Sequence, residues 1–521
     1  MQHDVVVIGA GHNGLVAATL LGRAGLDVVV VEERDTIGGA AKTERPFQRV
    51  PALQQSTGSY LLGLMPPEVL RIMDVELPLL RRDPHYFLPT TRHGSYLRYG
   101  THATTTDLLT ERDLKADAAL QDELAMLRDD IAPAWLQDPL PLEETAERFI
   151  RPQLRDTFVA LCRGSVAEYL DRFDFESELL VAMYVVTDGM SGLTAGPDTP
   201  GSGHNFLAHN MCRLPGADGT WMIVRGGMGT VSGCFADAAR AAGVTIQTAS
   251  RVVALDHAPD AVTGVYLEDG THLRSRVVLG ACDPFRLAAL AAADNGAGFP
   301  PPLQRRVGGM RRPGTTLKVN LALTDLPRFS CLPEEAQSPH GATVHLLRQD
   351  QPLTAVREMW ADVEAGRLPD EPTIEWYLHT TVDPSLRDDD GHHSSALFVQ
   401  SVPYEPAEGS WDGLLPGYVT RLLGQCDRFA PGTSDLVADS FALSPPGIEQ
   451  HFGISYGHIH HVDNTIAFAD RMPYATGIDG LYAGSAGCHP AGSVIGAAGV
   501  NAARKILADL DVAAADMPSY K

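Results

Sequence analysis

Paired cysteines and long uncharged apolar runs are both missing from this 521-residue sequence. The 7 cysteines are scattered along the chain, and none forms a C-x-x-C pair. We therefore do not expect a framework of disulfide bonds. No apolar run reaches the ~18 residues of a membrane span, and the stretch after Gly14 is broken by Arg23 and Asp27. The N-terminus has Asp4 where a signal peptide would carry positive charge. We therefore expect a cytoplasmic protein without a membrane span.

Positive charge is also scarce, because 41 Lys and Arg face 65 Asp and Glu and leave a net charge of −24. Such a charge repels phosphate backbones and anionic lipids, so we expect no nucleic-acid partner. Peripheral contact with a membrane and a lipophilic substrate both stay open. Lys318, in "TTLKVNLAL", is one of five lysines. It is either an active-site lysine or an ordinary lysine capped or exposed on a strand.

Glycine is plentiful by contrast, and its first cluster follows a strand-like run. The segment "DVVVIGAGHNGLVAATLLGRAGLDVVVVEE" reads as a buried strand, a helix and a second buried strand. Gly9, Gly11 and Gly14 form G-x-G-x-x-G at the first turn, where glycine lets the backbone approach a pyrophosphate at the helix N-terminus. Glu32 ends the second strand and can accept hydrogen bonds from ribose hydroxyls. The order of strand, glycine motif, helix, second strand and terminal acid predicts a dinucleotide-binding site.

The residues after Glu32 favour FAD over NAD. "ERDTIGGAAKTE" places Arg34 and the doublet Gly38–Gly39 beyond the second strand. This extension resembles the E-R-x-x-x-G-G signature of large FAD oxidoreductases of the glutathione-reductase-like superfamily. The doublet would let the backbone pass close to the pyrophosphate and ribityl chain, and Arg34 would add positive charge or lie at the surface. A soluble NAD dehydrogenase is the alternative that this extension disfavours.

Further segments extend the match over nearly the whole chain, among them "WMIVRGGMGTVSGCFADAARAAGVTI", "IEQHFGI" and "GIDGLYAGSAGCHPAGSVIGAAGVNAA". Together they resemble the phytoene dehydrogenase-related flavoproteins, a family that includes carotenoid desaturases and desaturase-type ketolases. The resemblance implies an α/β fold with a glutathione-reductase-like FAD-binding Rossmann domain and a discontinuous substrate domain of mixed β-sheet and helical cap. We expect the FAD domain to use residues 1–70, 216–290 and 470–521, and the substrate domain to use 71–215 and 291–469.

The resemblance also implies which residues meet the cofactor. The C-terminal small-residue loop would return to the flavin, and the helix after it would direct its N-terminus at the flavin O2, where negative charge develops. This sequence departs from relatives by carrying Ala491 and Ser493 where H-P-G-G-G-V has glycines. The FAD-binding residues expected beyond the first motif are Ala40, Val252, Gly484, Ser485, Ser493, Val494 and Ile495. Val252 would meet the adenine through its backbone or is an ordinary core valine. Ser59 and Tyr60 of "STGSYLLG" either approach the isoalloxazine or serve in packing.

Catalytic side chains are harder to read, because flavin carries the redox chemistry and an activated substrate needs no strong protein base. Candidates for polar interactions near the flavin ring are His489, Tyr456, His458 and His460. His489, which precedes a proline in the C-terminal loop, has a structural role as its alternative. The histidines of "SYGHIHH", with Asp463 nearby, could be structural, line a substrate pocket or bind a metal. We expect no metal.

The expected activity is dehydrogenation of a C–C bond in a lipophilic or natural-product-like substrate, by hydride transfer to flavin N5. A desaturase-type ketolase, or another C–H oxidation on the same flavin, is the runner-up. The electron acceptor would be O2, a quinone or a carrier. A GDP-dissociation-inhibitor-like binder of a lipidated partner, without redox chemistry, is an alternative from another class.

Overall fold

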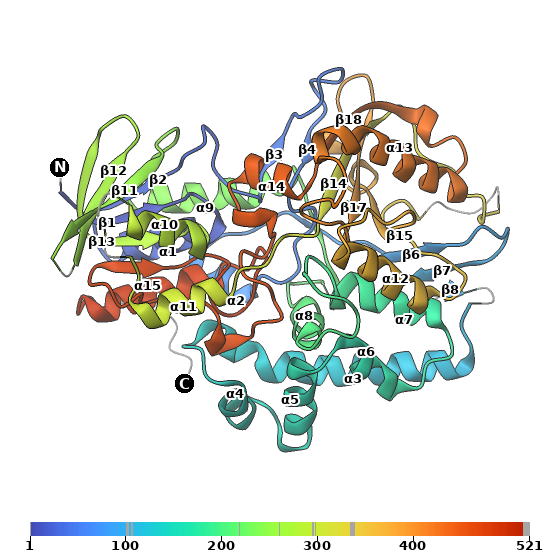
Figure 1. The fold of residues 1–521 in the computed structure, drawn as a ribbon, viewed down its shortest axis with the longest axis horizontal. Coiled ribbons are helices and arrows are strands. Elements are labelled where there is room, and N and C mark those ends of the chain that lie inside the picture. Colours follow the sequence, from blue (N-terminus) through green and yellow to red (C-terminus); the bar gives the residue numbers. More distant parts are fainter. Residues whose placement is uncertain are drawn as a thin grey trace.

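The N-terminal glycine loop lies on a seven-stranded sheet whose strands come from distant parts of the chain (Figure 1). The computed structural model describes residues 2–513 except 101–103, 106–107, 218, 260, 294–295, 297 and 334–338. The strand order is β10-β2-β1-β13-β12-β11, and β19 also pairs with β13. The strands are β1 (Gln2–Ile8), β2 (Val28–Val31), β10 (Thr245–Gln247), β11 (Val252–Ala258), β12 (Ala261–Leu267), β13 (His272–Gly280) and β19 (Leu481–Ala483).

The centre of this sheet is parallel, since β1 pairs in parallel with β2 and β13, and β13 pairs in parallel with β19. All four residues of β2 are buried, as the uninterrupted valines predict for a strand covered on both faces. Helix α1 (His12–Arg23) packs against α9 (Gly229–Ala241) and α15 (Ala497–Asp509). A glycine permits the contact with α15, because a Cβ at Gly499 would lie 2.3 Å from the Asn13 carbonyl oxygen. Gly14 in turn lets α1 pack on its own preceding loop, since a Cβ there would lie 2.2 Å from the Gly9 carbonyl oxygen.

A second, eight-stranded sheet has the order β18-β14-β17-β16-β15-β6-β7-β8. Alternate residues of its central strands are apolar and pack against the long helix α13 (Trp411–Phe429). The other face is also buried, although it carries polar and charged residues. The strands are β6 (Tyr86–Pro89), β7 (Tyr96–Tyr99), β8 (Thr104–Thr105), β14 (Leu317–Leu323), β15 (Thr343–Leu346), β16 (Ile374–Leu378), β17 (His393–Val399) and β18 (Val437–Leu443).

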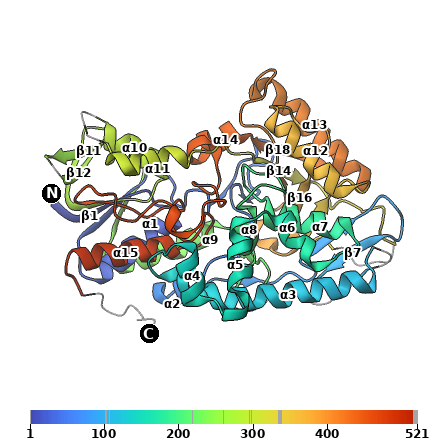
Figure 2. The same ribbon diagram turned by 60° about the horizontal axis from the view of Figure 1, so that its bottom comes forward.

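Helices between residues 111 and 209 form a layer beneath the second sheet (Figure 2). They are α3 (Glu111–Ile131), α4 (Leu142–Phe149), α5 (Arg155–Arg163), α6 (Val166–Leu170), α7 (Glu178–Tyr184) and α8 (Ser202–His209). The remaining elements are α2 (Pro67–Met73), α10 (Pro284–Ala292), α11 (Pro301–Gly309), α12 (Pro352–Glu364), α14 (Pro445–Phe452) and the strand pairs β3 (Thr43–Glu44) with β4 (Gln55–Ser56) and β5 (Leu79–Leu80) with β9 (Ile223–Val224).

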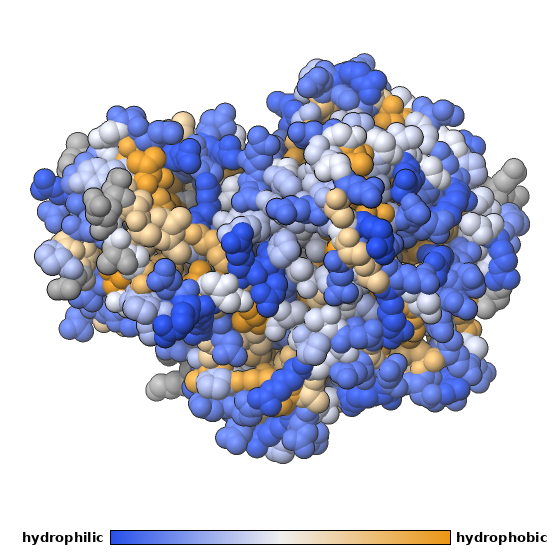
Figure 3. All heavy atoms as spheres, viewed as in Figure 1, coloured by the Kyte–Doolittle hydropathy of each residue, from blue (hydrophilic) through white to orange (hydrophobic). Residues whose placement is uncertain are grey.

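The α/β class with a mixed second sheet and a helical layer matches the fold class expected from the sequence. The exact domain boundaries stay a prediction. Among the helices in the described part of the chain, none combines the length and the hydrophobicity of a membrane-spanning segment. On the face shown in Figure 3, hydrophilic residues predominate and apolar residues form small separate patches.

Candidate active site

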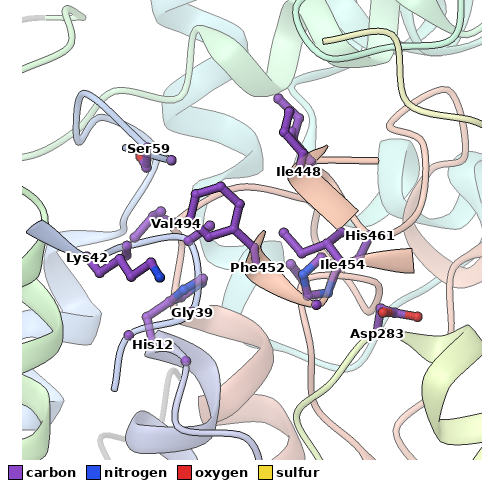
Figure 4. A pocket seen from close by; sticks show the side chains of 18 of the residues that line it. His12, Gly39, Lys42, Ser59, Asp283, Ile448, Phe452, Ile454, His461 and Val494 are labelled. Atoms are coloured by element: carbon purple, nitrogen blue, oxygen red, sulfur yellow. The ribbon is translucent and has the colours of Figure 1, made fainter. Parts of the chain in front are cut away.

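One cavity of about 520 Å³ reaches from the glycine loop of the first sheet to the buried polar face of the second. Its volume lies within the roughly 300–1,000 Å³ of small-molecule and cofactor sites. In Figure 4, His12, Gly39 and Lys42 lie on one side of it, and Ile454 and His461 lie on the other. The cavity therefore joins segments that are more than 400 residues apart in the sequence.

Most residues that the sequence assigns to FAD line this cavity. They are Gly9, Gly11, Glu32, Arg34, Gly38, Gly39, Ala40, Ser59, Val252, Ser493 and Val494. Gly14, Gly484, Ser485 and Ile495 lie outside the lining. A Cβ at Gly484 would lie 3.0 Å from the side chains of both Ala502 and Leu279, so this glycine lets β19 and α15 pack closely. The binding roles of all these residues stay predictions.

Glu32 is held by its own backbone neighbours at the edge of the cavity. Its two carboxylate oxygens accept hydrogen bonds from the amides of Ala10 (2.8 Å) and Arg34 (3.0 Å). Burial raises the pKa of Glu32 above its ordinary value. The Arg34 guanidinium donates to the Gln450 carbonyl oxygen at 2.7 Å, so it links the loop after β2 to α14. The carboxylate is thus fixed in place with acceptor capacity to spare.

The glycine loop has the space that a dinucleotide cofactor needs. A Cβ at Gly11 would meet no atom within 4 Å, and one at Gly39 would meet only the Gly11 Cα, at 3.8 Å. Side chains at these two positions would fill a cradle beside the N-terminus of α1, where unpaired amides favour phosphate. His12 Nε2 and His461 Nδ1 are buried without a hydrogen-bond partner among the described residues. The residues present fit a dinucleotide cofactor.

Of the four catalytic candidates, only His458 and His460 contact each other: the His460 amide donates to His458 Nδ1 at 3.4 Å, and the ring centres are 6.0 Å apart. Only His460 lines the cavity, where its Nε2 lies 2.9 Å from the Ser191 carbonyl oxygen. His489 donates from Nε2 to the Ala134 carbonyl oxygen at 2.9 Å, outside the cavity lining. The Tyr456 ring, also outside the lining, lies 4.0 Å from the Arg311 guanidinium. The observed contacts of His489 and Tyr456, a hydrogen bond and a cation–π contact, are structural. The catalytic roles of both residues stay predictions.

His458 is paired with Asp463 in the interior. Its Nε2 lies 3.1 Å from the Asp463 carboxylate, which also accepts the amides of Thr194 and Thr465. These contacts hold the pKa of Asp463 well below its ordinary value despite burial. Of the three readings of "SYGHIHH", the structural one fits His458, whereas His460 and His461 line the cavity.

Asp463→Ala is expected to lower the free energy of unfolding by about 3–5 kcal/mol, because it leaves a buried histidine and two amides without their acceptor. Urea denaturation at matched flavin loading measures the loss. The exposed neighbour Asp470 provides the control, since Asp470→Ala should change stability by less than about 0.5 kcal/mol. Equal stability of the two variants would contradict a stabilising role for the pair.

Lys318 is the principal cavity residue that the sequence left ambiguous. It is buried on β14, and its Nζ lies 4.0 Å from the centre of the Tyr60 ring and 4.1 Å from that of Phe398. Burial lowers the pKa of Lys318 to about 7, and nearby Glu375 opposes that shift. The lysine is therefore neither capped nor exposed, and about half of it is a neutral amine near pH 7.

Glu375 lies two strands away on the same face, because Phe398 is the register partner of both Lys318 and Glu375. Burial raises the pKa of Glu375 to about 7, while Tyr377 and Gln400 donate hydrogen bonds to its carboxylate. Both Lys318 and Glu375 line the cavity. The site thus holds a buried acid and a buried base whose pKa values lie near neutrality, as acid–base chemistry requires.

The missed residues did have a sequence signal. In "LKVNLAL" and "IEWYL", apolar residues alternate with other residues at a period of two. Such alternation ordinarily indicates a strand with one face in solvent. Here Tyr60 and Ile223 pack on that face, Gln55 hydrogen-bonds to Asn320 on it, and Thr187 hydrogen-bonds to His345. The polar residues of the face therefore become the wall of a cavity.

A dinucleotide cradle joined to buried acid–base groups defines an enzyme that works with a bound redox cofactor. The family model of flavin containing amine oxidoreductases matches residues 14–324. The chain belongs to this family, and it is a flavin-dependent oxidoreductase.

Relatives and solved structures extend this assignment along the chain. The rat "Pyridine nucleotide-disulfide oxidoreductase domain-containing protein 2" is 32% identical, with 98% of this chain and 94% of that protein covered. The hydroxyneurosporene desaturase of Cereibacter sphaeroides is 28% identical over 97% of this chain and 98% of its own. A crystal structure of an oxidoreductase from Methanosarcina mazei has a TM-score of 0.64 at 16% identity, covering 98% of this chain and 100% of that chain. The amine oxidase-like α/β fold is thereby confirmed.

Proposed function

We propose that the protein is an FAD-dependent oxidoreductase that dehydrogenates a C–C bond of a lipophilic small molecule. The observation that carries the proposal is one cavity that joins the glycine cradle to the buried polar face of the second sheet. We call the part of this cavity beside Lys318 and Glu375 the substrate chamber. Similarity to a desaturase over nearly the full chain favours this reaction class. The Gly38–Gly39 doublet and Glu32 favour FAD as the flavin. When bound, FAD supplies a two-electron oxidant.

The chain's own residues would position the substrate and move a proton. Lys318 Nζ can accept a proton as a neutral amine, and Glu375 can hold one as a neutral acid. The rings of Tyr60, Trp221 and Phe398 line the same chamber and exclude water from the reacting carbon. Oxidation of another C–H bond, including ketolase-type chemistry, is the second candidate. Oxidation of an amine is the third, because the family is named for that reaction.

Anaerobic bleaching of the flavin tests the proposal. The purified protein should be yellow, and a lipophilic substrate should remove its visible absorbance with formation of one C=C bond in the product. O2, a quinone or a protein carrier would then restore the absorbance, and the fastest of the three identifies the acceptor. Bleaching by amines alone would contradict the proposal in favour of amine oxidation. A colourless protein that FAD cannot reconstitute would instead favour the non-catalytic binder of a lipidated partner.

A further inference from the structure

Arg82 is a buried cation of the substrate chamber that the chemistry above does not use. It follows β5, lines the cavity and has 3% of its surface exposed. Its Nη1 donates to the Thr343 hydroxyl at 2.7 Å, and Nε and Nη2 both donate to the Trp221 carbonyl oxygen at 3.2 Å. These acceptors are neutral. Among the described residues, no carboxylate forms an ion pair with Arg82 at the 4.0 Å criterion, and Glu375 acts on Arg82 only at longer range.

Two of the five guanidinium N–H groups stay available after these three hydrogen bonds. They belong to Nη1 and Nη2, the pair that can hold both oxygens of a carboxylate side by side. The Tyr86 hydroxyl lines the same part of the cavity and makes no hydrogen bond to the described protein residues. Thr343 and Tyr86 are direct register partners on β15 and β6, so the arginine's partner and this hydroxyl lie on adjacent strands.

The charge around Arg82 is not balanced by its neighbours. Burial lowers the pKa of His85, His345 and His379 to about 3, with the positive charge of Arg82 contributing, so these rings are neutral. Burial raises the pKa of Asp188 to about 8, which leaves it protonated at pH 7. The pKa values of Lys318 and Glu375 are both about 7, so at pH 7 their average charges offset each other. Arg82 therefore keeps a positive charge that no ion-pair partner among the described residues offsets.

An unpaired charge in a protein interior is costly unless an opposite charge meets it. We propose that Arg82 binds a carboxylate of the substrate, which is thus an amphipathic acid whose apolar part lies along Tyr60, Trp221 and Phe398. This inference rests on the proposed function for the identity of the chamber and adds the substrate class. A cationic amine would instead meet like charge at Arg82, which disfavours amines as ligands of this end of the cavity.

Binding of an eight-carbon series to the purified flavin-loaded protein tests the inference without requiring turnover. Octanoate, octan-1-ol and octylamine share the apolar chain and differ in the head group. Binding is read from the flavin difference spectrum and from the thermal unfolding midpoint. We expect octanoate to bind at least about tenfold more tightly than the alcohol or the amine, as a charged hydrogen-bonded pair predicts. Equal affinities, or tighter binding of octylamine, would overturn the inference.

Two arginine variants test whether the preference for octanoate depends on Arg82. Arg82→Gln should weaken octanoate binding roughly 30-fold and leave octan-1-ol unchanged, whereas Arg81→Gln, at the exposed neighbouring position, should change neither. An equal loss in both variants would overturn the assignment. If Arg82→Gln does not fold, Arg82→Lys keeps the charge and should retain a reduced preference for octanoate over octan-1-ol; loss of that preference would also overturn it.

Competition by inorganic phosphate tests whether Arg82 binds a phosphate group instead of a carboxylate. Phosphate and acetate are each titrated against bound octanoate. If phosphate displaces octanoate at lower concentrations than acetate does, the carboxylate assignment is overturned in favour of a phosphate site. Failure of the proposed dehydrogenation can be told apart from failure of the Arg82 site. If the protein prefers octanoate but no acid bleaches its flavin, the Arg82 site is supported and the reaction is contradicted. If only neutral hydrocarbons bleach the flavin, the reaction is supported and the Arg82 site is contradicted.

Discussion

Lys318→Met is expected to slow anaerobic flavin reduction at pH 7 by at least about 100-fold, the lower end of what general acid–base catalysis contributes. Methionine keeps the length and apolar contacts of the lysine between Tyr60 and Phe398, but it removes the amine that accepts a proton. Stopped-flow reduction by the substrate that bleaches the wild-type flavin measures the effect. Flavin content should stay at the wild-type level, since the cradle lies on the other sheet.

The pH dependence separates a base from a packing role. Protonated Glu375, whose pKa is also about 7, would give a falling limb at higher pH. Because the pKa of Lys318 is about 7, loss of its proton should give the wild-type rate a rising inflection near pH 7. Lys318→Met should abolish this inflection. Glu375→Gln should move it to lower pH, because the Glu375 charge raises the pKa of Lys318. Lys115→Met, at an exposed position on α3, is the matched control; an equal rate loss there, or an unchanged inflection in Lys318→Met, would rule out the base.

Gly11→Val is expected to yield a folded protein that has lost its flavin. The backbone at Gly11 (φ −71°, ψ 168°) suits valine, and its Cβ would meet no protein atom within 4 Å. The isopropyl group would fill the space that the cofactor needs, and such overpacking costs about 1–3 kcal/mol or more. Flavin content after purification, measured as visible absorbance relative to protein absorbance, should fall at least about tenfold.

Two other glycines serve as controls for this variant. Gly417 is exposed on α13, so Gly417→Val should leave flavin content unchanged. Gly14→Ala should instead lower the stability of the whole fold, because its Cβ would lie 2.2 Å from the Gly9 carbonyl oxygen. Retention of wild-type flavin by Gly11→Val would show that the cofactor does not approach this cradle.

The cofactor end of the cavity could be predicted because its parts are local in sequence. The turn at Gly9–Gly14 and the carboxylate of Glu32 belong to one β-α-β unit, whose spacing the chain itself dictates. The position of the C-terminal loop beside that unit came from the family resemblance. Its pairing with the first sheet is visible only in the parallel register of β13 and β19.

The substrate end could not be predicted, since its chemistry depends on pairings between distant strands. Lys318 and Glu375 share a face only because β14, β17 and β16 are neighbours in a particular register. The pKa values of both residues follow from burial, which period-two alternation does not indicate. Among the three histidines of "SYGHIHH", sequence spacing alone could not separate His458, which is paired with Asp463, from His460 in the cavity lining.

The contact of α15 with α1 also sets an order of events during synthesis. Residues 2–31 leave the ribosome early, but β19 and α15, which pack against β13 and α1, end only at residue 509. At 5–20 residues per second, the interval is roughly 25–100 s. Throughout it, the face of α1 around Asn13 that Gly499 later covers is open to chaperones and to wrong partners. The lining of the cavity is therefore also completed late, because Ser493 and Val494 are synthesised only shortly before α15.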